Sequence, residues 1–116
     1  MKIFAKNVVI TLIIIIIIGF IALPYGDPRL ISISITLEII FIAMLIAILL
    51  KSYKKTLYFC IAVAIIVIIG NTLAPPHIHL MTTFERPFNA ILLIIGGYIL
   101  QASLIFNSII ALKKQE

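Results

Sequence analysis

Four apolar runs, each long enough to cross a lipid bilayer, constrain this chain more than any other feature of its sequence. They cover residues 7–23, 30–50, 56–74 and 87–112. A helix rises about 1.5 Å per residue, so about 20 apolar residues cross the roughly 30 Å of hydrocarbon in a bilayer. Because only 11% of the 116 residues are charged, the chain cannot build the charged surface of a soluble globular enzyme.

The runs predict helices rather than the strands of a barrel. Their apolar residues are continuous, as in Ile13–Ile18, whereas barrel strands alternate apolar and polar side chains. In lipid the backbone must satisfy its own hydrogen bonds, and a helix does so within one segment. We therefore expect an all-α integral membrane protein, a single four-helix transmembrane bundle with outer loops at 24–29 and 75–86 and an inner loop at 51–55.

The basic residues predict how the chain is oriented in the membrane. Two of them, Arg29 and Arg86, fall on one side, and seven fall on the side of the termini: Lys2, Lys6, Lys51, Lys54, Lys55, Lys113 and Lys114. Cytoplasmic loops carry an excess of Lys and Arg, so we expect a multi-pass protein of the cell membrane with both termini in the cytoplasm. Because these charges are scattered between apolar runs, the net charge of +5 does not indicate nucleic-acid binding.

Glu38 is the one acidic residue inside an apolar run, about 12 Å below its outer end by helical rise. An acidic residue at the bilayer centre costs about 3 kcal/mol on insertion scales and often marks a functional site. Ser34 lies one turn above it on the same face, and the last run offers Tyr98 and Gln101 at a similar depth. One interpretation is a proton relay or ion site between the second and fourth runs. The other is a protonated Glu38 that bonds Tyr98, Gln101 or a carbonyl and fixes the helix register.

The last run also carries a face of small and polar residues that favours close helix packing and hydrogen bonds between helices. Its members recur at helical spacing and are Ala90, Gly97, Gln101, Leu104 and Ser108, with Gly96 beside them.

Two histidines follow the proline pair in the second outer loop. On an extended strand, side chains alternate between two sides, so His77, His79 and Met81 would share one side. Imidazole and thioether groups suit copper, which makes a weak copper site one interpretation. In the other, the histidines face lipid headgroups or a partner protein. No histidine lies inside a run, so we do not expect haem ligation by this chain alone, or any other cofactor.

The run Leu37-Glu38-Ile39-Ile40 resembles the glutamate-bearing second helix of small membrane subunits in respiratory complex I and in related antiporter and hydrogenase assemblies. The resemblance implies a place in a proton-translocating complex. A glutamate in the second run followed by a basic loop is also similar to the four-span membrane proteins that phosphate starvation induces.

The sequence contains no glycine-rich phosphate loop, no nucleophile paired with a base and no acidic cluster. We therefore expect no enzyme activity from this chain alone. Our leading hypothesis is a small accessory subunit that packs against other integral membrane subunits of a respiratory or other redox assembly. The alternative is a small homo-oligomeric proton-coupled transporter or channel in which Glu38 titrates.

Overall fold

The computed structural model describes residues 3–25, 30–50 and 53–114, and within these ranges the chain is helical with no strand. Four helices are long and apolar enough to cross a membrane: Ala5–Tyr25, Ile31–Leu49, Lys54–Leu73 and Pro87–Lys113. The predicted all-α class with four candidate membrane-spanning helices is confirmed for this part of the chain. Residues 26–29 of the expected outer loop and 51–52 of the inner loop lie outside the described residues, as does Lys2.

The last span is continuous but not uniform. In chain order the elements are α1 (Ile3–Ala22), a 3-10 turn η1 (Leu23–Tyr25), α2 (Ile31–Leu49), α3 (Tyr53–Leu73), α4 (Pro75–Thr83), α5 (Pro87–Ile94), a π-helical turn η3 (Ile95–Ile99) and α6 (Leu100–Lys113). α5, η3 and α6 together form the fourth span.

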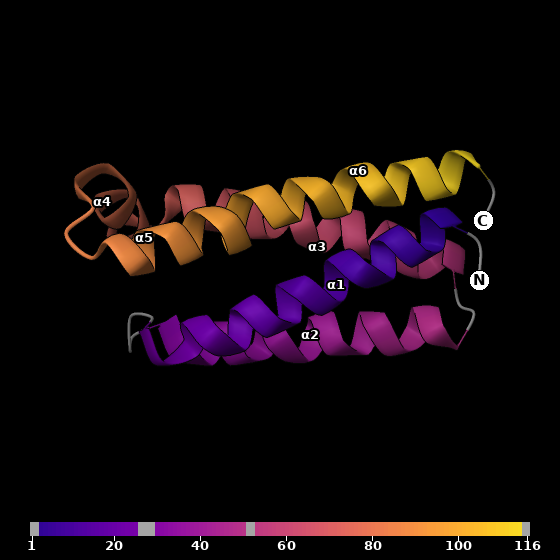
Figure 1. Ribbon diagram of the computed structural model, residues 1–116, viewed down its shortest axis with the longest axis horizontal. Coiled ribbons are helices and arrows are strands. Elements are labelled where there is room, and N and C mark those ends of the chain that lie inside the picture. Colours follow the sequence, from indigo (N-terminus) through magenta and orange to yellow (C-terminus); the bar gives the residue numbers. More distant parts are fainter. Residues whose placement is uncertain (1–2, 26–29, 51–52, 115–116) are drawn as a thin grey trace.

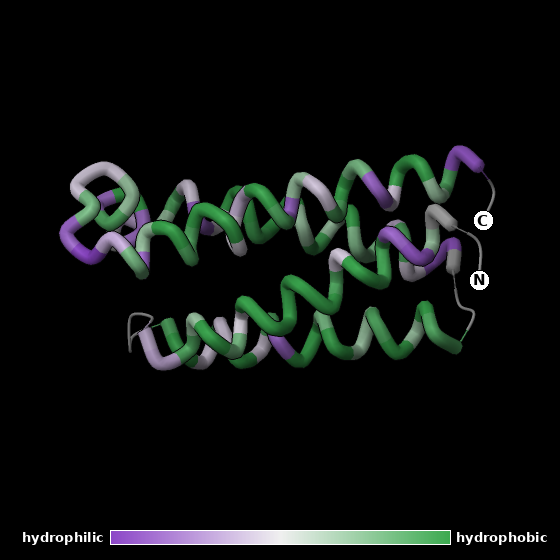
Figure 2. The backbone as a smooth tube through the Cα atoms, viewed as in Figure 1, coloured by the Kyte–Doolittle hydropathy of each residue, from purple (hydrophilic) through white to green (hydrophobic). Residues whose placement is uncertain are grey.

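The spans run up and down in chain order, so the start of α1 and the end of α6 lie at the same end of the bundle (Figure 1). α1 crosses the bundle obliquely and packs on both α2 and α6, while α3 packs on α6. Hydrophobic residues cover the helices along their length, and hydrophilic residues gather towards the two ends (Figure 2). The short helix α4 lies at the end opposite the termini (Figure 1).

Apolar packing is concentrated in one half of the bundle. The buried core combines the first halves of α1 and α3 with the second half of α2 and most of α6, through Val8, Leu12, Ile15, Phe41, Met44, Ile48, Leu57, Cys60, Ala64, Leu104 and Ala111. We call this part, which holds the start of α1 and the end of α6, the core half. The part that carries α4 is called the cavity half, for the reason given below.

The segment with the two histidines is helical, and the expectation of an extended strand is wrong. Pro75 fits the first turn of α4, where a missing N–H removes no hydrogen bond. The hydroxyl groups of Thr82 and Thr83 donate to carbonyl groups one turn back in the same helix. The helix ends at Phe84, whose φ of 52° lies in the left-handed region and whose N–H bonds the carbonyl of Leu80.

If the core half supplies most of the stability, Leu104→Ala should lower the free energy of unfolding by about 2–5 kcal/mol, because it leaves a cavity among packed neighbours. Leu104 is fully buried, whereas Ile66 is 64% exposed on the outside of α3. The control Ile66→Ala should therefore change the free energy of unfolding by only about 0.5 kcal/mol. Denaturant titration in detergent micelles measures both, and equal losses would contradict the asymmetric packing.

Candidate functional site

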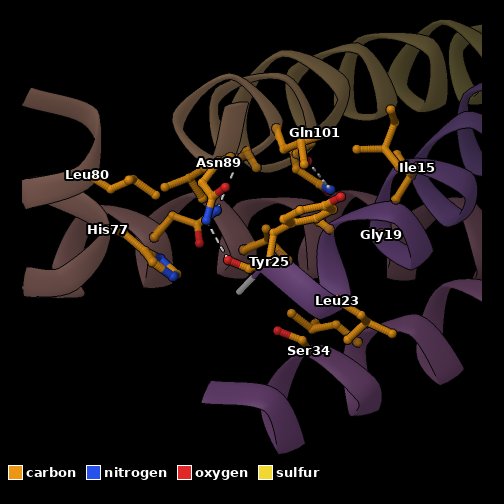
Figure 3. Close-up of a pocket in the computed structure, with 18 of the residues that line it drawn as sticks. Ile15, Gly19, Leu23, Tyr25, Ser34, His77, Leu80, Asn89 and Gln101 are labelled. Atoms are coloured by element: carbon orange, nitrogen blue, oxygen red, sulfur yellow. Dashed lines mark hydrogen bonds between the residues drawn. The ribbon is translucent and has the colours of Figure 1, made fainter. Parts of the chain in front are cut away.

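The cavity half encloses a hollow of about 900 Å³ between all four spans. Its walls come from the second half of α1, the first half of α2, the end of α3 and the α5–η3–α6 span, and residues of α4 line it as well. Figure 3 shows side chains from these elements around one space, with Gly19 and Leu23 from the first span, Ser34 from the second and Gln101 from the fourth. The hollow is large enough for a drug-sized ligand.

Among the described residues, Glu38 is the one acidic or basic side chain that is buried. It lies about 10 Å along α2 from Ile31, lines the hollow and is only 7% exposed. Its carboxyl group lies directly over Gly19 of α1, where an added methyl group would collide with Oε1. Oε2 is buried and has no hydrogen-bond partner among the described residues. Glycine at position 19 thus provides the room that the carboxyl group occupies.

No hydrogen bond in the described part of the chain joins Glu38 to Ser34, Tyr98 or Gln101, the residues that the sequence placed near it. The hydroxyl group of Tyr98 is 3.0 Å from Oγ1 of Thr72 on α3, and Tyr98 does not line the hollow. Ser34 lines the hollow one turn from Glu38 but is exposed. Gln101 also lines it, yet its amide Nε2 donates to the carbonyl of Gly96 at 3.0 Å rather than to the carboxyl group. The structure therefore brings Ser34, Glu38 and Gln101 to one cavity without bonding them to one another.

Gln101 contributes a second buried acceptor. The residue is 2% exposed, and its Oε1 has no hydrogen-bond partner in the part of the chain that the structure describes. Burying a polar group without a hydrogen bond costs free energy. Two of the residues that line the hollow, Glu38 and Gln101, thus each carry a buried acceptor oxygen with no partner among the described residues.

The π-helical turn η3 shapes the wall that carries Gln101. Asn71 of α3 donates from Nδ2 to the carbonyl of Gly97 at 3.3 Å, and a methyl group added at Gly97 would collide with that amide. Side-chain donors therefore reach two backbone carbonyls of this turn, those of Gly96 and Gly97. π-helical turns are rare in proteins, but those that occur are often found at functional sites. Asn71 also lines the hollow, a role that sequence reasoning missed.

The predicted packing face of the last span lies inside the bundle. The buried members are Ala90, Gly97, Gln101, Leu104 and Ser108. Gly96 is half-buried and faces α1, because an added methyl group would stand 3.1 Å from Cγ2 of Ile18. Asn89 ties the start of this span to the end of α1 through a 2.6 Å hydrogen bond to the carbonyl of Tyr25, seen in Figure 3.

The three donors of the proposed copper site do not share one face. His77 and Met81 lie four residues apart on α4, whereas His79 is rotated by about 200° from His77 around the helix axis. His79 instead places Nε2 3.0 Å from Oε2 of Glu85. Within the described residues, no group of three or more His, Cys, Asp or Glu side chains is arranged to hold a metal ion.

Gly19 was missed by sequence reasoning, although it interrupts an isoleucine-rich run and is the one glycine of α1.

Replacing Gly19 by alanine tests its contact with Glu38. Gly19→Ala should destabilise the fold by about 1–3 kcal/mol through overpacking, and this loss should shrink in the double variant with Glu38→Ala. The control is Gly70→Ala, where an added methyl group meets nothing within 4 Å; it should be neutral or stabilising by up to about 1 kcal/mol. Additive effects of Gly19→Ala and Glu38→Ala on the free energy of unfolding would contradict the contact.

We compared the chain with known proteins. No protein-family model, no curated protein and no solved structure matches it. The functional argument therefore rests on the cavity and on the groups that line it.

Proposed function

We propose that this chain is a small, non-catalytic subunit of a larger membrane complex, to which it contributes an intramembrane polar cavity. The observation that carries the proposal is that apolar packing is concentrated in the core half. The other half holds a hollow of about 900 Å³, lined by Glu38, whose buried Oε2 has no partner among the described residues. Protein interiors normally pack as densely as organic crystals. A hollow of this size around polar groups favours a role for the cavity rather than for a surface loop.

The outer surface of the bundle supports a partner among integral membrane proteins. Large apolar side chains are exposed on each of the four spans, among them Phe20, Ile39, Phe59 and Phe106. Such helix faces lie against lipid or against other helices. We propose that neighbouring subunits cover part of this surface and that the catalytic residues of the complex belong to them.

We propose a respiratory or other redox assembly as the class of complex. Carboxyl groups inside membrane helices form proton relays in pumps and transporters, and proton translocation accompanies electron transfer in such assemblies. The resemblance of Leu37–Ile40 to the second helix of small complex I subunits points the same way.

We also propose an orientation in the membrane. By the positive-inside rule, the more basic end of the bundle faces the cytoplasm; this end carries Lys6, Lys54, Lys55, Lys113 and Lys114. In this orientation α4 and Arg86 lie on the outer side.

A second candidate is a homo-oligomeric proton-coupled transporter or channel. The observation that favours it is the position of Glu38, which is nine-tenths buried yet lines a cavity that exposed residues at the α4 end, such as Glu85 and Arg86, also line. A carboxyl group in that position can exchange a proton or bind a cation from the hollow. In this case two or more copies of the chain would complete the pathway.

Gentle extraction of the tagged chain from native membranes tests the first proposal. We expect the chain to migrate on native gels with larger membrane subunits at fixed stoichiometry, because those subunits cover its apolar faces. Mass spectrometry of the band identifies them, and redox subunits are the expected result. Migration as a homo-oligomer in all mild detergents would reject the subunit proposal and leave the transporter.

Glu38→Gln separates the two candidates by function. The amide keeps the size of the side chain but cannot carry a proton or a negative charge. In a subunit whose carboxyl group sets helix register, assembly should persist with a modest loss of stability. In a transporter, proton flux in reconstituted vesicles should collapse. Glu85→Gln, on an exposed side chain at the mouth, serves as the matched control and should retain flux and assembly.

A further inference from the structure

We propose that the cavity is a binding site for an amphipathic organic cation, an alkylammonium whose charged group is held by Glu38 and Gln101. This proposal goes beyond both candidate functions and depends on neither. It starts from the two acceptor oxygens, Oε2 of Glu38 and Oε1 of Gln101, which are buried without partners among the described residues.

The two side chains line the same hollow from opposite elements, Glu38 from α2 and Gln101 from α6. Glu38 contacts Gly19. Gln101 bonds the carbonyl of Gly96, and Gly96 lies against Ile18, the neighbour of Gly19. An ammonium group in the hollow would serve both acceptors once the two oxygens turn towards it.

The ligand group must supply donors. Amide Nε2 of Gln101 is already engaged, and the remaining oxygen of Gln101 and the carboxylate of Glu38 only accept. An ammonium group carries up to three N–H donors and no acceptor. It therefore satisfies both oxygens, whereas an ether, ketone or carboxylate would add further acceptors.

Charge favours a cation over a neutral donor. The basic residues that the structure describes all lie at helix ends, namely Lys6, Lys54, Lys55, Arg86, Lys113 and Lys114. None of these described side chains is paired with Glu38. A carboxylate at this depth is expensive without a cation, and hydrogen bonds between opposite charges are stronger than neutral ones. A cationic ligand removes the unbalanced charge and an alcohol does not.

The rest of the cavity suits an apolar body and an entrance for charge. Its apolar lining includes Ile15, Phe41 and Leu92. At the mouth of the cavity, Glu85 is paired with His79. Arg86 is exposed there, so solvent and salt screen the repulsion between Arg86 and an incoming cation. The hollow is bounded by all four spans and α4, which favours an enclosed small molecule over a helix of a partner protein.

The test uses the full chain in nanodiscs of zwitterionic lipid and two probes of matched size, 4-phenylbutylammonium and 4-phenylbutanol. Binding is measured by calorimetry and by thermal stabilisation. We expect the ammonium to bind about ten- to a hundredfold more tightly than the alcohol, the range expected for a hydrogen bond to a charged group. Glu38→Gln should abolish that preference, while Thr36→Val, at an exposed position of α2 outside the lining of the hollow, should keep it.

Equal binding of the two probes would overturn the proposal, as would a preference that survives Glu38→Gln. Because Glu38→Gln keeps the side-chain volume, the variant should still fold, and a retained cooperative melting transition in the absence of probe shows that loss of binding is not loss of the fold. Gln101→Met provides an independent variant and should reduce ammonium binding several-fold without affecting the alcohol. These outcomes do not depend on co-migration with other subunits, so failure of the site and failure of the proposed function are distinguishable.

Discussion

The buried carboxyl group of Glu38 determines where the apolar core of this bundle ends. On α2 the core face is formed by Ile48, Met44 and Phe41, and the next position of that face along the helix is Glu38, with Ser34 beyond it. An apolar side chain there would continue the stripe that packs helices together. Instead the carboxyl group occupies the space above Gly19, and beyond this point the bundle encloses a hollow.

The last span makes the same change at the same level. Its core face contains Ala111 and Leu104, and the next position is Gln101. The π-helical turn begins two residues further along, at Ile99, and two of its carbonyl groups receive hydrogen bonds from Gln101 and Asn71. In an apolar environment such carbonyls must be satisfied within the protein. Two helices that are distant in sequence therefore replace apolar packing with polar groups at one depth, and this coincidence creates the cavity.

The spans could be predicted from the sequence because their length and helical form follow from continuous apolar runs and from backbone hydrogen bonding. The expected fourth run, 87–112, corresponds to the span Pro87–Lys113. Depth along a run also suggested that Ser34, Glu38 and Gln101 belong together. The direction of Tyr98 could not be predicted, because it depends on how the fourth span is rotated against α3. The helical form of the histidine segment was missed because the alternation of His77, His79 and Met81 was taken as a sign of an extended strand. The proline at its first turn, together with Thr82 and Thr83 near its end, is compatible with the helix that the structure shows.

The two halves of the bundle differ in the kind of interaction that holds them. The core half rests mainly on packed apolar side chains, the larger of which, such as Leu104, each stabilise the fold by several kcal/mol. The cavity half has fewer buried apolar side chains, Ala90 and Leu92 among them. It relies more on polar contacts such as Asn71 with Gly97 and Asn89 with Tyr25, and hydrogen bonds of this kind contribute about 1 kcal/mol each. Regions with fewer buried contacts open at lower free energy. The core half is therefore the fixed frame of the molecule, and the cavity half is the part able to adjust its helices to whatever occupies the space beside Glu38.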